Sequence, residues 1–293
     1  MEVLLPRTLE EALAMKASTP EAVPIAGGTD LMVEINFDHA RPEILIDLTR
    51  VAELASWRLD GDRLFVGAGM TYARLLRELP QMRALAEASR SVGSPQIRNR
   101  GTLGGNLGTA SPAGDSLPVL AAHDAEVVLI SAARGERSVP WDAFLVGVKR
   151  TSARPDELIL GARWRALGGP QSFSKVGTRN AMVIAVVSLC FALDPEARTA
   201  RVALGSVAPT VVRAPEAEAF LAAAFEDAGV WDDPGAPVPG GTVEAFAERV
   251  VAATRPIDDV RGSAAYRRHA VRVLAQRALR WAVGERATEA MVS

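Results

Sequence analysis

Residues 99–115 read Asn-Arg-Gly-Thr-Leu-Gly-Gly-Asn-Leu-Gly-Thr-Ala-Ser-Pro-Ala-Gly-Asp. The stretch is rich in glycine and has few side chains large enough to fill a core. Glycine lets a ligand lie directly on the main chain, and successive exposed amides in a loop can bind an anion such as a pyrophosphate. A flexible surface linker would repeat Gly and Ser, whereas this stretch contains the rigid Pro112 and ends in Asp115. The sequence therefore favours a ligand-binding loop over an ordinary surface loop.

A second glycine segment lies upstream, where residues 23–31 read Val-Pro-Ile-Ala-Gly-Gly-Thr-Asp-Leu. The apolar run predicts a buried strand that leads through a glycine turn into a helix-compatible stretch at 31–37. Such an arrangement directs main-chain amides and a helix dipole to one place, where phosphate is favoured. Neither a Walker A lysine nor a Gly-x-Gly-x-x-Gly pattern is present. One such segment would more often be a tight turn, but two favour a shared ligand.

Strand and helix signals alternate along the first part of the chain. A capping-box pattern at Thr8 and Glu11 predicts a helix through about Lys16, and Asp60-Gly61 predicts a hairpin. Gly168-Gly169-Pro170 is the best candidate for a domain boundary. Beyond it we expect long strands at 182–193 and 201–207, followed by helices at 215–225, 243–253 and 263–283.

Composition excludes several classes of protein. The chain has 293 residues, 48% of them hydrophobic and 23% charged, with a net charge of −2, which is typical of a globular protein and gives no electrostatic footprint for nucleic acid. No apolar stretch is long enough to predict a membrane span, and no secretory signal is apparent. The single cysteine, Cys190, lies in an apolar run and is expected to be buried. These features predict a cytoplasmic protein.

The sequence predicts no catalytic residue and no metal ligand in this chain. The three histidines lack metal-ligand spacing, and one cysteine cannot hold an iron–sulfur cluster. Nothing resembles a hydrolytic triad or a paired-carboxylate site. This pattern is typical of a cofactor carrier, in which the cofactor does the chemistry. Only three of the 33 basic residues are lysines, so Lys16, Lys149 and Lys175 attract notice.

Residues 26–31 and 97–107 together resemble the FAD-binding subunit of molybdenum hydroxylases. That family includes the medium subunit of aerobic carbon monoxide dehydrogenase and the flavin domain of xanthine dehydrogenase. The likeness continues at 110–118 and 258–268 and covers nearly the whole chain. It implies an α+β fold, with a two-part FAD-binding domain of the p-cresol methylhydroxylase type at 1–168, divided at about residue 55. A smaller α+β domain with a short antiparallel sheet and a helix bundle would follow at 169–293, similar to the C-terminal domain of the carbon monoxide dehydrogenase flavoprotein.

The resemblance also implies a non-covalent FAD site. Its pyrophosphate would lie on Ile25, Ala26, Gly27, Gly28, Thr29, Asp30 and Leu31, with Thr102, Gly105, Asn106, Gly108 and Thr109 on the other side. Asp115 would accept ribose hydroxyls; without the resemblance, helix N-capping would explain this residue equally well. Ile159 and Lys175 would lie beside the isoalloxazine, and Ile184 would cover one of its faces. Residues 179–183 depart from the family pattern, which leaves the docking of the electron acceptor open.

The function implied by the resemblance is electron transfer. The chain would carry FAD in a heteromeric molybdenum hydroxylase and pass electrons from iron–sulfur clusters of a small subunit to an external acceptor. A large subunit would bind molybdopterin, and the complex would be a dimer of heterotrimers. Two alternatives remain: a free-standing FAD-dependent oxidase or dehydrogenase of the p-cresol methylhydroxylase superfamily, and a non-catalytic subunit that binds a nucleotide.

Overall fold

The computed structural model describes residues 1–292 and divides into two compact units, each of mixed helix and sheet. Unit 1 comprises Met1–Pro80, Val92–Ser111 and Asp124–Arg165. Unit 2 comprises Gln81–Ser91, Pro112–His123 and the chain from Ala166 onward. Two segments from the predicted first domain thus pack within unit 2. The predicted domain boundary between residues 168 and 169 stays a prediction.

Unit 1 begins with a small parallel sheet in the order β1-β3-β2, formed by β1 (Glu2–Leu4), β3 (Ile44–Asp47) and β2 (Val23–Ile25). Helix α1 (Leu9–Ser18) joins the first two strands in sequence, and α2 (Leu31–Asn36) follows β2. The predicted capping box at the start of α1 is confirmed, because Thr8 Oγ1 accepts a hydrogen bond from Glu11 N at 3.1 Å. Two short 3₁₀ helices at Leu48–Arg50 and Ala52–Ala55 lead out of this sheet.

The larger sheet of unit 1 is antiparallel, in the order β4-β5-β10-β6-β7. Its strands are β4 (Trp57–Asp60), β5 (Arg63–Gly67), β10 (Leu158–Arg165), β6 (Glu126–Ser131) and β7 (Gly135–Pro140). The unit also contains the helices α3 (Tyr72–Glu78), α5 (Pro95–Arg100), α6 (Leu103–Thr109) and α8 (Trp141–Phe144), and the hairpin of β8 (Leu145–Gly147) and β9 (Arg150–Thr151). The hairpin predicted at Asp60-Gly61 is confirmed, and Gly61 has a φ of 59° that glycine adopts without strain.

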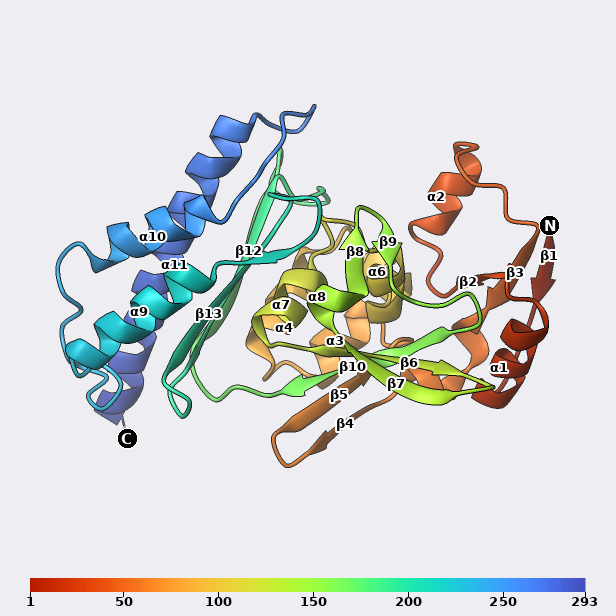
Figure 1. Ribbon diagram of the computed structural model, residues 1–293, viewed down its shortest axis with the longest axis horizontal. Coiled ribbons are helices and arrows are strands. Elements are labelled where there is room, and N and C mark those ends of the chain that lie inside the picture. The colour runs from red at the N-terminus through yellow and green to blue at the C-terminus, as the bar shows by residue number, and fades with distance from the viewer. Residues whose placement is uncertain (293) are drawn as a thin grey trace. The chain divides into compact units, whose positions relative to one another are not determined.

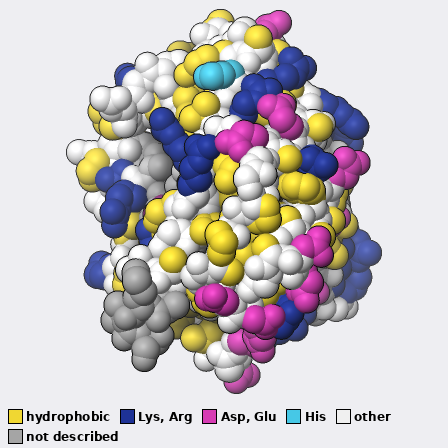
Figure 2. Space-filling model, turned by 90° about the vertical axis from the view of Figure 1, so that its left-hand side faces the viewer, with side chains coloured by type: hydrophobic (Ala, Val, Ile, Leu, Met, Phe, Trp, Pro, Cys, Tyr) yellow, Lys and Arg dark blue, Asp and Glu magenta, His cyan; other side chains and the backbone are white. Residues whose placement is uncertain are grey.

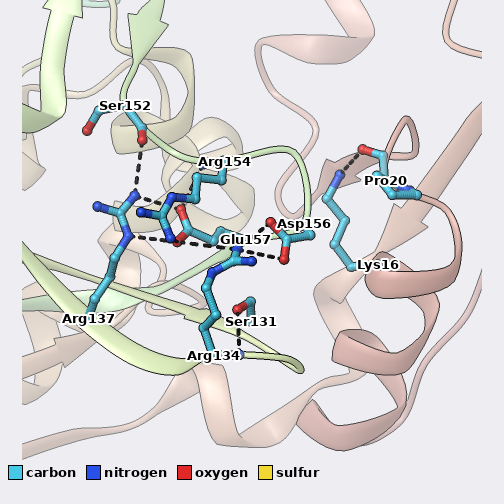
Figure 3. A network of polar contacts seen from close by, with 9 residues as sticks. All are labelled: Lys16, Pro20, Ser131, Arg134, Arg137, Ser152, Arg154, Asp156 and Glu157. Carbon is cyan, nitrogen blue, oxygen red and sulfur yellow. Dashed lines mark hydrogen bonds and ion pairs between the residues drawn. The ribbon is translucent and has the colours of Figure 1, made fainter.

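An ion-pair network fixes the start of β10 (Figure 3). Arg137 on β7 donates to both oxygens of Glu157, at 2.7 Å each, and Arg134 binds Asp156 at 2.6 Å. The Glu157 side chain is 2% exposed, and its bidentate pair with Arg137 lowers its pKa. Because Glu157 directly precedes β10, the network holds the strand that carries Ile159.

Unit 2 is built on an antiparallel sheet in the order β11-β12-β13-β14, which is the short antiparallel sheet that the sequence analysis expected. Its strands are β11 (Gln171–Val176), β12 (Val187–Asp194), β13 (Thr199–Gly205) and β14 (Val212–Arg213), and its helices are α4 (Arg83–Ser91), α7 (Ser116–Ala122), α9 (Pro215–Asp227), α10 (Thr242–Ala252) and α11 (Ala264–Val292). Figure 1 shows α9, α10 and α11 on one side of the sheet and α4 and α7 on the other.

Residues of β12 alternate between these two helical layers. Leu189 and Phe191 belong to the apolar cluster that includes α9, α10 and α11, and the Phe191 ring meets Phe246 of α10 edge to face at 5.8 Å between centroids. Ser188 and Cys190 face the other way, toward α7 and α4. Every residue of β12 is therefore buried, which explains the continuous apolar run in the sequence.

The predicted strand at 182–193 is wrong at its start, because β12 begins at Val187. Met182 has a φ of 51°, and the Arg179 guanidinium binds the carbonyl oxygens of Ala181 and Met182 in a turn. Met182 and Ile184 are 54% and 55% exposed. An apolar run predicts a buried strand, but these apolar side chains lie in an exposed turn before it.

The arginines of α11 do not form a simple solvated basic face. Arg272 and Arg280 bind Glu248 and Glu244 of α10, with closest side-chain distances of 2.5 and 2.8 Å. Arg267 is 2% exposed and lies within unit 2. Figure 2, which views the left-hand side of Figure 1, shows Lys and Arg side chains interspersed with Asp and Glu on that face.

The buried His123 at the end of α7 should make the stability of unit 2 depend on pH. Its Nδ1 lies 2.8 Å from Val119 O and its Nε2 lies 3.0 Å from Gln171 Oε1. Burial lowers the pKa of His123, so the unfolded chain takes up a proton at a higher pH than the folded chain does. The free energy of unfolding should therefore fall as the pH drops below about 6.5.

Urea unfolding of the wild type and His123→Gln at about pH 7.5 and about pH 5.5 checks this expectation. His123→Gln should show a smaller loss of stability between the two pH values. The same substitution at exposed His269 serves as the control and should retain the wild-type loss. An equal loss in His123→Gln would contradict the assignment to His123.

Candidate functional site

The first glycine segment forms the predicted turn between β2 and α2 in unit 1. Gly28 has a φ of 73°, and its carbonyl oxygen accepts a hydrogen bond from Met32 N at 3.1 Å. Gly27 packs against the second glycine segment, because an added Cβ atom would lie 2.0 Å from the carbonyl oxygen of Arg100. The Thr109 hydroxyl donates to Asp30 Oδ2 at 3.1 Å. The structure thus brings the two segments together, as the sequence analysis expected of a shared site.

The second glycine segment is mostly helical, so its prediction as a loop is wrong. Helices α5 and α6 occupy most of it, and Thr102 caps α6 by accepting a hydrogen bond from Gly105 N at 2.9 Å. Leu103 and Leu107 are buried in the unit, which offsets the entropic cost of ordering glycine in a helix. Gly104 faces the same way, since its added Cβ would lie 2.4 Å from the Cβ of Ala68. Tertiary packing of α6 therefore outweighs the low helix propensity of its glycines.

The opposite face of α6, here called the bare face, exposes its backbone at two glycines. Gly105 and Gly108 are exposed, and Asn106 and Thr109 are partly exposed beside them. An added Cβ at Gly108 would have only the Ile159 Cδ1 atom within 4 Å, at 3.7 Å. Ile159 lies on β10, where the pairing with β6 is interrupted by a bulge. Two glycines, an amide, a hydroxyl and an aliphatic side chain therefore line one side of α6.

Asp115 and Lys175 form a buried ion pair in unit 2. Lys175 Nζ lies 2.6 Å from Asp115 Oδ2 and 3.1 Å from the carbonyl oxygen of Ser91, which ends α4. The Lys175 and Asp115 side chains are 10% and 5% exposed. Lys175 occupies the fifth of six positions of β11 and pairs with Ser188, so its side chain faces the α4 side of the sheet. Lys175 is therefore largely shielded from solvent and lies near the end of its strand.

The alternative role of Asp115 as a helix N-cap is wrong. Asp115 precedes α7, but its backbone is helical and, within the described chain, its side chain makes no capping hydrogen bond. Burial raises the pKa of Asp115, and the Lys175 ammonium opposes that rise. Asp115 Oδ1 is buried, and the described residues offer it no hydrogen-bond partner. Because a buried polar atom is normally paired, this oxygen is suited to accept a hydrogen bond from a ligand.

Ser91 contacts both Asp115 and Lys175, and the sequence did not identify it as a site residue. Its Oγ lies 3.1 Å from Asp115 Oδ2, and its carbonyl oxygen binds Lys175. A serine at the end of a predicted helix carries no signal for such a role, because the contact depends on how α4 packs against β11. Ile184 lies in the turn before β12 and is 55% exposed.

Among the described residues, no group of three or more His, Cys, Asp or Glu side chains is placed to hold a metal ion. Within residues 1–292, no helix is both long and apolar enough to cross a membrane.

Comparisons with known proteins cover both units. Residues 1–163 match the FAD binding domain in molybdopterin dehydrogenase, and residues 172–282 match the CO dehydrogenase flavoprotein C-terminal domain. The chain is 30% identical to the carbon monoxide dehydrogenase medium chain of Hydrogenophaga pseudoflava, over 94% of each protein. A segment covering 54% of the chain is 39% identical to the nicotinate dehydrogenase FAD-subunit of Eubacterium barkeri and spans 56% of that protein.

The fold agrees with these matches. A solved structure of carbon monoxide dehydrogenase from Hydrogenophaga pseudoflava contains a chain that aligns with a TM-score of 0.83 and 29% identity, over 98% of both chains. The glycine segments, the buried Asp115–Lys175 pair and the matches along both units lead to one conclusion: the chain belongs to the family of FAD-binding subunits of molybdenum hydroxylases.

Proposed function

We propose that this chain is the FAD-carrying electron-transfer subunit of a heteromeric molybdenum hydroxylase. It would receive electrons from the iron–sulfur clusters of a small subunit and pass them to an external acceptor. A large subunit would hold molybdopterin and oxidise the substrate, and the complex would be a dimer of heterotrimers. Family membership supports this proposal, since similar proteins carry the names medium chain and FAD-binding subunit. A cytoplasmic location stays a prediction.

The bare face of α6 in unit 1 fits a bound dinucleotide. When bound, FAD supplies the electron chemistry, while the protein supplies binding, orientation and local electrostatics. Main-chain amides of 25–31 and the Thr29 hydroxyl would hold the pyrophosphate at the turn before α2. Gly105 and Gly108 leave room for the ligand to approach the backbone, and Asn106 and Thr109 would bind polar groups beside them.

The observation in unit 2 that carries the proposal is the unpartnered Oδ1 atom of Asp115. Lys175 holds the other carboxylate oxygen at 2.6 Å, so one acceptor is fixed in place while the other stays available for ribose hydroxyls. The ion pair also revises the expected role of Lys175. Because Asp115 compensates its charge, Lys175 would act on the isoalloxazine mainly as part of a dipole and less as a lone cation.

The names of the relatives do not point to one substrate. Their names include carbon monoxide dehydrogenase and nicotinate dehydrogenase, although each contributes a similar flavin chain. A substrate site on a partner subunit would explain why similar flavin chains accompany different activities. The two alternative functions, a free-standing oxidase and a non-catalytic nucleotide-binding subunit, predict different results in the following experiment.

The test is to purify the chain alone and together with candidate molybdopterin and iron–sulfur subunits. We expect the chain alone to bind FAD, seen by its absorption bands, and to oxidise no substrate. Substrate-dependent reduction of the FAD should appear only in the complex. Oxidation by the isolated chain would support the free-standing oxidase, and a chain that retains nucleotide without flavin absorption would support the structural subunit.

Gly108→Ala should separate FAD binding from folding. Alanine should stabilise α6 by about 0.5–1 kcal/mol, because glycine loses more conformational entropy in a helix. If FAD lies against the exposed face of α6, the added methyl group should weaken FAD binding about tenfold or more. Isothermal titration with FAD and urea unfolding measure the two effects.

Gly104→Ala is the matched control on the buried face of the same helix. Its Cβ would lie 2.4 Å from Ala68 Cβ, so overpacking should lower the free energy of unfolding by about 1–3 kcal/mol. Unchanged FAD affinity in Gly108→Ala would show that the cofactor does not lie on this face.

Variants of the buried ion pair should distinguish a ligand role for Asp115 from a structural one. Asp115→Ala leaves the Lys175 charge buried without its partner, which should cost about 3–5 kcal/mol of stability. It should also weaken FAD binding about ten- to a hundred-fold through the loss of charge-assisted hydrogen bonds. In the double variant Asp115→Ala/Lys175→Met, stability should recover while FAD affinity stays low. Recovery of both stability and FAD affinity would mean that Asp115 serves only to compensate the charge of Lys175.

A further inference from the structure

Residues 258–268 make structural contacts in unit 2 that are separate from the FAD contacts proposed above. They form the loop before α11 and the first residues of that helix. Asp258 Oδ1 accepts a hydrogen bond from Ala264 N at 2.5 Å, and Ser263 Oγ accepts one from Tyr266 N at 3.2 Å. These contacts cap the N-terminus of α11 and thereby fix the position of Arg267 in its first turn.

Arg267 is a buried charge with several fixed partners. Its side chain is 3% exposed, and Nη2 lies 2.7 Å from Asp259 Oδ1. Nη1 donates to the carbonyl oxygens of Val186 at 2.6 Å and Ser206 at 2.8 Å. Val186 directly precedes β12 and Ser206 directly follows β13, so one guanidinium joins the two strands at the same end of the sheet. A lysine could not reproduce this planar set of donors.

Ser206 extends the contacts of Arg267 to two other segments. Its hydroxyl donates to Ala185 O at 3.0 Å, and its amide donates to Pro112 O at 2.8 Å. Ala185 directly follows Ile184, and Pro112 begins the segment that leads to Asp115. Ser206 adopts a φ of 63°, a conformation uncommon for a residue other than glycine, which indicates that its surroundings impose it.

We propose that Arg267 is a positioning residue that, through Ser206, holds Ile184 and the Asp115 segment in the arrangement that FAD requires. This inference rests on the proposed function of the chain. Ala185 and Val186 are each 1% exposed, whereas Ile184 is 55% exposed, so a rigid anchor lies directly beside the side chain that would cover the flavin ring. Without the guanidinium, the carbonyl oxygens of Val186 and Ser206 would lose this donor, and the turn at 182–186 would gain freedom.

The experiment compares FAD-loaded wild type, Arg267→Met and Arg267→Lys, with Arg272→Met as the matched control. Arg272 lies on the same helix and binds Glu248 at the surface, so its loss should leave the flavin unaffected. Arg267→Met should weaken FAD binding about tenfold or more and shift the flavin absorption and fluorescence spectra. Arg267→Lys should recover only part of the affinity. Ser206→Gly, which keeps the backbone conformation and removes the hydroxyl, should shift the spectra in the same direction by less.

A double-mutant cycle with Ile184→Ala tests whether Arg267 acts through the turn. The spectral effect of Arg267→Met should shrink in the Ile184→Ala background, because the side chain that it positions is gone. An effect of equal size in both backgrounds overturns the inference, as does normal FAD affinity and spectrum in Arg267→Met. A wild-type chain that binds no FAD overturns the proposed function itself, and this outcome is visible before any variant is made.

Discussion

Strand β12 is buried on both faces, and this constraint determines where the polar groups of unit 2 can lie. Its odd-numbered residues pack on α9, α10 and α11, so α4 and α7 must cover the other face. Lys175 pairs with Ser188 on that second face, and its side chain is only 10% exposed there. A lysine there requires a carboxylate, and Asp115 at the start of α7 supplies it at 2.6 Å. The ion pair is thus a consequence of how the sheet is covered.

Close backbone packing has the corresponding role in unit 1. Gly27 and Gly104 contact Arg100 and Ala68 so closely that no side chain fits. These contacts join the turn before α2 to the end of α5, and α6 to the residue that follows β5. The glycines that remain exposed, Gly105 and Gly108, lie on the face of α6 that packing does not use. Glycines adjacent in sequence therefore serve two purposes, tight packing on one face and an accessible backbone on the other.

The sequence predicted the elements whose signals are local. The capping box of α1, the hairpin at Gly61 and the helices of unit 2 follow from short patterns. It did not predict that residues 103–109 form a helix, because the contacts that stabilise α6 come from distant residues such as Ala68. It also placed the start of β12 too early, since apolar residues of an exposed turn resemble those of a buried strand. Asp115 and Lys175 were each identified, but their pairing depends on sheet register and helix packing.

The packing of α4 and α7 within unit 2 has an evolutionary consequence. The matched families divide the chain between residues 163 and 172, yet α4 and α7 lie before that point in sequence and cover a face of the sheet that lies after it. A recombination event at the sequence boundary would leave the new C-terminal part with helices from a foreign parent. Only parents with matching α4 and α7 surfaces could yield a stable hybrid. Changes in either part that alter the α4 and α7 contacts should therefore be matched by changes in the other, although the two matched families divide the chain at this boundary.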